Sequence, residues 1–198
     1  MKTILKSIAA AALLSGFLAT GASANLPPPG EGLVLVPAVK QATQPVQKKQ
    51  APQFKRAKIV AYGANKPAGS IVIDTNKNVL YYVLGNGKAA KYRIATAKPG
   101  FEWAGTHKVS LKKTWPDWRP PAEMRKRRPD LPAFMAGGPE NPLGARAIYL
   151  GSSIYRIHGT NEPSSIGKRA SSGCIRMLNE DVSELYRFVK LGATVTVI

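Results

Sequence analysis

Ser171-Ser172-Gly173-Cys174-Ile175-Arg176-Met177 is the most informative stretch of this 198-residue chain, because it holds the chain's one cysteine. Sixteen residues upstream, His158 lies in Ile157-His158-Gly159-Thr160. With no second cysteine, Cys174 can form no disulfide within the chain, so its thiol is either buried and inert or used in chemistry. The glycines that flank both side chains favour chemistry.

A histidine near a cysteine suggests a nucleophile and its base. The thiolate is the nucleophilic form of cysteine, and an imidazole within hydrogen-bond reach can take the proton. Gly159 and Gly173 lack Cβ atoms and allow a substrate backbone to approach. We therefore predict catalytic roles for Cys174, His158 and Gly173, with the N–H groups of Gly173 and Cys174 holding an oxyanion. A zinc site that adds His107 matches no standard ligand spacing, and we predict no metal.

The first 24 residues have the pattern of an export signal. Lys2 and Lys6 precede an apolar stretch over residues 8–18, and Ala22-Ser23-Ala24 is typical of a cleavage site. We expect cleavage after Ala24 and a periplasmic protein; the alternative is an uncleaved N-terminal anchor, the one expected contact with a membrane. No cysteine follows the cleavage site, which excludes a lipid-anchored lipoprotein.

The chain is strongly basic, with 29 Lys and Arg against 11 Asp and Glu, a net charge of +18. The signal contains two Lys and no acidic residue, so its removal leaves 27 basic against 11 acidic residues, or +16. Such a charge implies a polyanionic partner. Export argues against nucleic acid, whereas a cell wall rich in carboxylates or an anionic membrane face fits the compartment.

Composition divides the rest of the chain in two. Residues 25–57 are rich in Pro, Gln and Lys and are expected to form a flexible linker, in which Leu33-Val34-Leu35-Val36 either stays solvated or docks as a strand. Residues 58–198 are long enough for one domain with a hydrophobic core.

The domain is predicted to be mostly β, in the α+β class. Turn residues at 75–78, 85–87 and 151–152 separate β-rich runs, the first three of which are expected to form an antiparallel meander. The predicted strands are 70–74, 79–84, 91–95, 147–150, 153–158 and 194–198.

One helix is predicted over residues 181–191. Val182, Leu185, Tyr186 and Val189 fall on one helical face. Asn179 is the expected N-cap, and Gly192 the expected residue just past the end.

Residues 101–146 are too long for an ordinary connection. They are rich in Pro and Gly and contain all three tryptophans and the run Arg125-Lys126-Arg127-Arg128. Segments of this length are usually lids or binding loops. The alternative is a surface insertion whose tryptophans cover the core.

The two motifs together resemble a known signature. His158-Gly159-Thr160, a spacer of about a dozen residues and Ser171-x-Gly173-Cys174-Ile175-Arg176-Met177 are similar to the active-site signature of the L,D-transpeptidases, the YkuD-type catalytic domain. The resemblance extends over roughly residues 68–198 and includes Asn141-Pro142-Leu143-Gly144. Many members have His where this chain has Ser172. The family implies a mixed β-sheet or sandwich with one main helix after the nucleophile loop.

The resemblance also implies an activity on peptidoglycan stem peptides. Cys174 would attack the carbonyl between the third stem residue and a terminal D-Ala, His158 would relay protons, and no cofactor would be needed. Arg176 matches the family's arginine and would pair with a stem carboxylate or brace the cysteine loop. The other expected substrate-binding residues are Gly159, Thr160, Ser171 and Ser172.

Several alternatives stay open at this point. The acceptor is another stem, water, a free D-amino acid or a protein anchored to the wall. A non-catalytic, cationic peptidoglycan-binding protein would keep the fold and use only its charge, but it would not need a thiol. His107 lies outside the motif and is expected at the surface.

Overall fold

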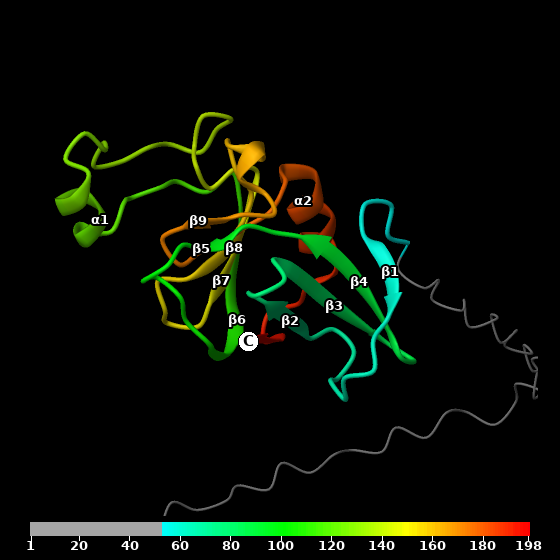
Figure 1. Ribbon diagram of the computed structural model, residues 1–198. Helices are drawn as coiled ribbons and strands as arrows, with labels where there is room; N and C mark the ends of the chain where they lie inside the picture. Colours follow the sequence, from blue (N-terminus) through cyan, green and yellow to red (C-terminus); the bar gives the residue numbers. More distant parts are fainter. Residues whose placement is uncertain (1–52) are drawn as a thin grey trace, which may run out of the picture. The chain divides into compact units, whose positions relative to one another are not determined.

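The computed structural model describes residues 53–198 (Figure 1). The expected signal at 1–24, the linker up to residue 52 and the segment Leu33–Val36 within it lie outside the described residues. The described elements are β1 (Lys58–Ala61), β2 (Ile71–Asp74), β3 (Val79–Gly85), β4 (Lys88–Arg93), β5 (Thr96–Ala97), β6 (Gly105–Thr114), α1 (Ala122–Arg127), β7 (Arg146–Leu150), β8 (Arg156–His158), the 3₁₀ turn η1 (Pro163–Ser165), β9 (Arg169–Ser171), β10 (Ile175–Arg176), α2 (Asn179–Phe188) and β11 (Thr194–Val197).

Nine of these strands form one mixed sheet in the order β1-β4-β3-β2-β11-β6-β7-β8-β10, and β5 pairs with β9. The predicted antiparallel meander is confirmed as β2-β3-β4. Its second turn uses Asn86 and Gly87, both at positive φ (50° and 67°), as a tight hairpin requires. The β2–β11 and β8–β10 pairs are parallel. The mostly β, α+β class predicted from the sequence is therefore correct.

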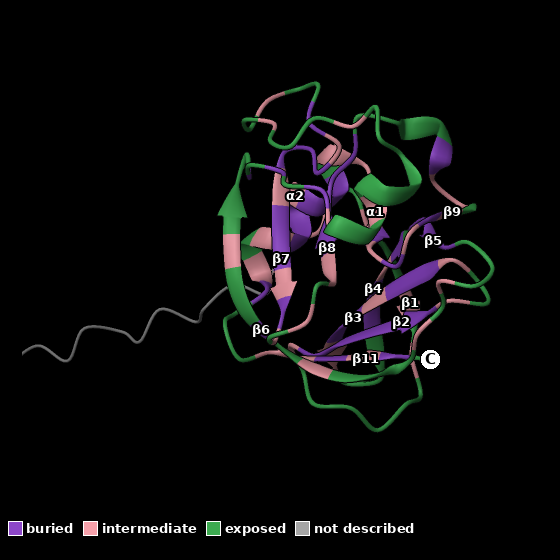
Figure 2. Ribbon diagram, turned by 90° about the vertical axis from the view of Figure 1, so that its left-hand side faces the viewer, coloured by how far each residue is buried: buried purple, intermediate pink, exposed green. Residues whose placement is uncertain are grey.

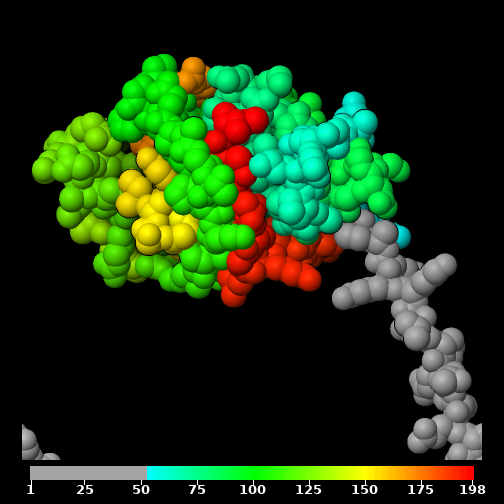
Figure 3. All heavy atoms as spheres, turned by 90° about the horizontal axis from the view of Figure 1, so that it is seen from below, coloured from blue at the N-terminus to red at the C-terminus, as the bar shows by residue number. Residues whose placement is uncertain are grey.

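Strand β6 was not predicted, and it divides the 101–146 segment. It pairs with β11 through residues 105–108 and with β7 beyond Val109, with a register shift between Val109 and Leu111. Such a bulge bends a strand and lets it serve both halves of a sheet. Most of β6 is exposed (green in Figure 2), so it lacks the apolar alternation by which strands are recognised. Figure 3 shows the C-terminal residues, in red, running between β6 and β2.

The hydrophobic core draws on both halves of the sheet and on α2. Ile71 and Leu80 come from one half, Ile148 and Ile157 from the other, and Leu185 from the helix; all are 0% exposed. Figure 2 shows the buried residues of β7 and α2 in purple. The sheet therefore curls around a common core, and its short strands at one end carry the candidate site.

Helix α2 is confirmed, but both predicted caps are wrong. Leu178 is the N-cap, and the helix ends at Phe188, before the extended Val189. Asn179 cannot cap because its side chain is bonded to the loop after β8. Gly192 (φ 79°) forms part of the turn into β11. Within residues 53–198, no helix is long and apolar enough to cross a membrane.

Residues just before β1 are held against α2. The Glu184 carboxylate accepts backbone N–H bonds from Lys55 (2.6 Å), Arg56 (3.0 Å) and Ala57 (3.0 Å). The ring of Phe54 lies 4.4 Å from that of Phe188. These residues belong to the end of the expected linker at 25–57, and here they contact the core.

Candidate active site

The pairing of β8 with β10 brings the predicted nucleophile and base together. Ile175 pairs with Ile157 and Arg176 with His158, so Cys174 lies opposite Arg156. Because side chains alternate along a strand, both isoleucines point into the core, where they are 0% and 1% exposed. The other four side chains, from Arg156, His158, Cys174 and Arg176, share the opposite face, so the two motifs form one site.

His158 is held in a defined tautomer. Its ring is buried, with 4% exposure, and Nδ1 lies 2.6 Å from the Gly159 carbonyl oxygen. A carbonyl oxygen only accepts, so Nδ1 carries the proton and the lone pair of the neutral ring is on Nε2. Burial lowers the pKa of His158 to about 3; the Gly159 bond opposes this shift, and the nearby Arg176 and Arg156 add to it. The resting imidazole is therefore neutral at pH 7 and able to accept a proton.

Cys174 rests as a protonated thiol. Its Sγ lies 3.9 Å from the Ile154 carbonyl oxygen, and no hydrogen bond joins it to His158 in the described chain. Burial raises the pKa of Cys174, and the positive charges of Arg156 and Arg176 oppose that rise. Thiolate formation therefore needs help from a base when substrate is present.

The nucleophile loop is shaped by Ser171 and by two stacked rings. Ser171 Oγ donates to the Cys174 carbonyl (2.6 Å) and accepts from the Gly173 N–H (3.1 Å). Trp103 donates from Nε1 to the Gly173 carbonyl (2.6 Å), and its ring stacks on Tyr155 at 4.1 Å. A Cβ on Gly173 (φ 113°) would lie 2.7 Å from Tyr155 Cε1. The position of Tyr155 therefore requires glycine at residue 173. The Gly173 N–H is already bonded to Ser171 Oγ.

Two residues predicted to bind substrate, Gly159 and Thr160, do not line the cleft. A Cβ on Gly159 would collide with Asn179 Oδ1, so this glycine makes room for Asn179 and not for a substrate. Asn179 Oδ1 accepts from the N–H groups of Ala145 (2.9 Å) and Thr160 (3.2 Å), and its Nδ2 donates to the Thr160 carbonyl (3.0 Å). Asn179 thus ties the loop after His158 to the start of β7.

A cleft of about 450 Å³ surrounds Cys174 and is lined by the other predicted residues except Gly173, which was predicted to be catalytic and is not among the lining residues. His158, Ser171, Ser172 and Arg176 line it, whereas His107 lies on β6 beside Trp103 and is not among the lining residues. Much of the wall comes from the loop between β6 and β7, which carries α1 (Figure 1). This confirms the predicted lid or wall for that part of the 101–146 segment; the lining residues from it are Trp118, Pro121, Met124, Arg127, Arg128, Leu131, Pro142 and Leu143.

The wall segment is fastened by Asn141, which is 1% exposed. Its Nδ2 lies 3.1 Å from the Pro116 carbonyl and 2.9 Å from the Ala136 carbonyl, so it joins the two ends of the loop. Trp118 pairs with Met135 in an isolated bridge. Asn141, part of the stretch included in the family resemblance, therefore has a structural role in holding the wall of the cleft.

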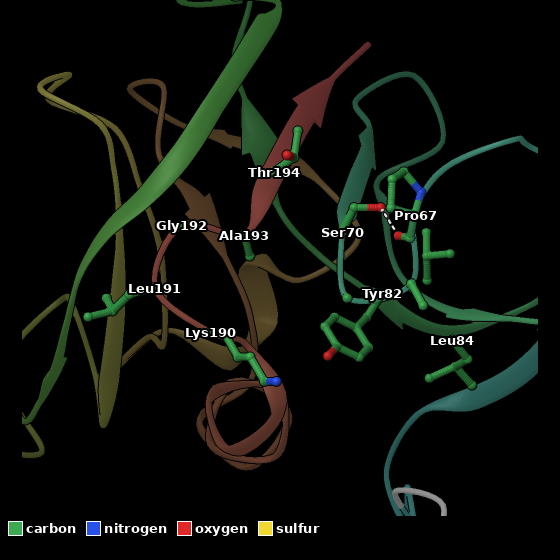
Figure 4. Close-up of a pocket in the computed structure, with 12 residues that line it drawn as sticks. Pro67, Ser70, Tyr82, Leu84, Lys190, Leu191, Gly192, Ala193 and Thr194 are labelled. Atoms are coloured by element: carbon green, nitrogen blue, oxygen red, sulfur yellow. Dashed lines mark hydrogen bonds between the residues drawn. The ribbon is translucent and has the colours of Figure 1, made fainter.

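A hollow of similar size lies between the start of β2 and the loop after α2 (Figure 4). Its walls are mainly aliphatic and backbone, with Ser70 donating to the Pro67 carbonyl (2.6 Å). Neither Cys174 nor His158 contributes to it. The cleft around Cys174 is therefore the candidate active site.

The buried His158 should make the protein sensitive to mild acid. The pKa of His158 is about 3 in the folded chain, against about 6.5 for a free histidine. As the pH falls below 6.5, the histidine takes up a proton in the unfolded chain but not in the folded chain, so acid favours unfolding. Stability should fall by about 1.4 kcal/mol per pH unit between these values. Urea unfolding should give a protein about 2 kcal/mol less stable at pH 4.5 than at pH 6.5, where the unfolded histidine is already half protonated.

His158→Gln should flatten this dependence, whereas His107→Gln should retain it. A wild-type protein equally stable at both pH values would mean that the folded ring is protonated, as in a resting thiolate–imidazolium pair.

Comparison with known proteins agrees with the fold. The mostly β domain presents a cysteine and a histidine on one sheet face, the arrangement that a cysteine-dependent catalytic domain needs. The family model of the L,D-transpeptidase catalytic domain, YkuD, matches residues 68–198. The chain belongs to this family, as the two motifs predicted.

Two curated relatives from Escherichia coli are longer than this chain. Probable L,D-transpeptidase ErfK/SrfK of Escherichia coli is 37% identical over 138 residues, which are 66% of this chain and 44% of the relative. The match to probable L,D-transpeptidase YbiS of the same organism covers 43% of that protein. The chain thus matches less than half the length of either relative.

Solved structures share the fold. An L,D-transpeptidase from Mycobacterium smegmatis is 18% identical, with a TM-score of 0.53 over 65% of this chain and 57% of that chain. A Brucella melitensis protein described as a probable carnitine operon oxidoreductase, caia, is 45% identical, with a TM-score of 0.50 over 74% of this chain and 95% of that chain. That description names a different reaction class and concerns the Brucella protein.

Proposed function

We propose that this protein is an exported L,D-transpeptidase that acts on peptidoglycan stem peptides through a cysteine acyl-enzyme. The observation that carries the proposal is the shared face of β8 and β10, which presents Cys174 beside a buried, neutral His158 whose Nδ1 is already bonded. Family membership supports the reaction class.

Acylation would begin with proton transfer from the Cys174 thiol to His158 Nε2. The thiolate attacks the carbonyl between the third stem residue and the terminal D-Ala, forming the C–S bond. No hydrogen bond within residues 53–198 uses the Cys174 amide N–H, so that group is free to hold the oxyanion, unlike the N–H of Gly173. Collapse breaks the C–N bond, the imidazolium protonates the leaving amine, and D-Ala departs from a thioester.

An amine would then attack the thioester, with His158 accepting its proton and the thiol as the leaving group. The acceptor is another stem or a protein anchored to the wall; water would give hydrolysis instead. Residues 1–24 would direct export to the periplasm, where such acceptors occur.

The direct test is incubation of the purified protein with muropeptides that carry D-Ala-terminated tetrapeptide stems. We expect free D-Ala, a covalent adduct equal to the stem minus D-Ala by intact-protein mass spectrometry, and a cross-linked product. Binding to wall fragments with neither D-Ala nor adduct would instead identify the alternative, a non-catalytic cationic wall-binding protein.

The basic run on and after α1 should promote capture of the wall. Arg127 and Arg128 line the cleft, and Arg128 also pairs with Asp130. Exposed charges are individually weak and screened by salt, so their joint effect should appear at low ionic strength. Replacing Arg125, Lys126, Arg127 and Arg128 with Gln should weaken sedimentation with wall fragments about tenfold at low salt.

A matched variant removes the same charge elsewhere, through Lys58, Lys66, Lys88 and Lys190→Gln. It should lose less binding than the α1 variant. Equal losses in the two variants would mean that overall charge, and not the cleft wall, captures the polymer.

A further inference from the structure

The Arg156 guanidinium forms no hydrogen bond or ion pair with another described residue. Its Nε is shielded from solvent and has no hydrogen-bond partner, and no hydrogen bond or ion pair within residues 53–198 involves this side chain. A buried donor without a partner costs about 1–3 kcal/mol and is rare in folded proteins. Arg156 lies opposite Cys174 and lines the cleft, so an anionic ligand in the cleft can supply the missing acceptor.

Two of the other four cationic side chains that line the cleft form ion pairs within the protein, and two contact an aromatic ring. Arg176 Nη1 lies 3.0 Å from Glu162 Oε2, which favours the bracing role considered for it from the sequence. Arg128 pairs with Asp130, and both Lys98 and Arg127 lie over the ring of Phe101. Lys98 and Arg127 also lack an ion pair, but Arg156 is the unpaired cation that lies opposite Cys174 on the paired strands. Arg156 is therefore the cation best placed to bind substrate.

Its neighbour on β7 holds the guanidinium in place. Tyr149 is the cross-strand partner of Arg156, and the guanidinium carbon lies 5.3 Å from the centre of its ring. A cation over an aromatic face keeps its N–H edges available for hydrogen bonds. A planar group presented in this way suits two-point binding of a carboxylate.

We propose that Arg156 binds the terminal carboxylate of the donor stem, one residue beyond the bond that Cys174 attacks. This inference rests on the proposed function. Neighbouring strands such as β8 and β10 lie about 4.8 Å apart, and one peptide residue spans about 3.8 Å. A carboxylate one residue past the carbonyl that Cys174 attacks therefore falls within reach of Arg156 on the opposite strand. The ligand class is a peptide with a free C-terminal carboxylate.

The test compares a synthetic tetrapeptide stem ending in D-Ala with its C-terminal amide, by calorimetry on Cys174→Ala protein, which cannot turn the peptides over. A charge-assisted hydrogen bond predicts about 10- to 100-fold tighter binding of the acid. Adding Arg156→Gln should reduce that ratio toward one, and Arg156→Lys should restore part of it. Equal affinity for acid and amide in the parent, or a ratio that survives Arg156→Gln, would overturn the proposal.

Two further variants separate this role from general effects of charge. Arg176→Gln and the exposed helix residue change Arg187→Gln should both keep the acid preference. Loss of the preference in Arg176→Gln, with its survival in Arg156→Gln, would assign the carboxylate to Arg176 and reject Arg156.

A D-Ala release assay on protein with Cys174 intact separates the two proposals. Acid-selective binding that depends on Arg156, without D-Ala release, would support the carboxylate site and reject the transpeptidase function. D-Ala release without acid-selective binding would support the transpeptidase function and reject the carboxylate site.

Discussion

Cys174→Ala is expected to abolish D-Ala release, with a loss on the order of 10⁴-fold or more, the scale seen when the nucleophile of a covalent enzyme is removed. The chain has no other thiol to substitute for it. The cleft is otherwise built from backbone and side chains that do not depend on Sγ, whose one hydrogen bond in the described chain is a long contact with Ile154. D-Ala release from tetrapeptide stems and the mass of the acyl-enzyme measure the effect.

The same variant should keep its fold and its affinity for wall fragments. Thermal unfolding and sedimentation with wall material are the controls. An alanine variant that folds and still releases D-Ala at a tenth of the wild-type rate would remove Cys174 from the mechanism.

The juxtaposition of the proposed nucleophile and base could be predicted because each motif places an apolar strand residue beside the reactive one. Ile157 and Ile175 are apolar residues next to His158 and Cys174, so burying them turns the two reactive side chains to the same opposite face. Strands β2 and β3 were recognisable as runs rich in β-branched and aromatic residues, and α2 was recognisable because its buried apolar residues recur with the helical period.

Other features could not be read from the sequence because they depend on neighbours distant along the chain. Strand β6 has a single buried residue, Val109, and is held by backbone pairing with β7 and β11. The glycines at 159 and 173 were predicted to admit a substrate backbone, but the fold shows that Asn179 and Tyr155 occupy the space where their Cβ atoms would lie. Arg156 was missed because an arginine in a short strand gives no sign that its guanidinium lacks a partner.

His158→Gln should slow acylation by about 10²–10⁴-fold, the usual contribution of a general base. Burial raises the pKa of Cys174, so at neutral pH few molecules carry a thiolate without help. His158 Nε2 is the group on the same sheet face that can accept the thiol proton, since Nδ1 is bonded to Gly159. Single-turnover acylation with a tetrapeptide stem, followed by the mass of the adduct, measures the loss.

The pH dependence separates a base from a structural role. In the glutamine variant, acylation should depend on thiolate already present and should rise with pH toward the raised pKa of Cys174, so that alkaline solution recovers part of the lost rate. His107→Gln, on β6 outside the cleft, should acylate at nearly the wild-type rate. The reverse ranking of the two variants would assign the base to His107, and a glutamine variant with no alkaline recovery would indicate that His158 holds the loop rather than moves the proton.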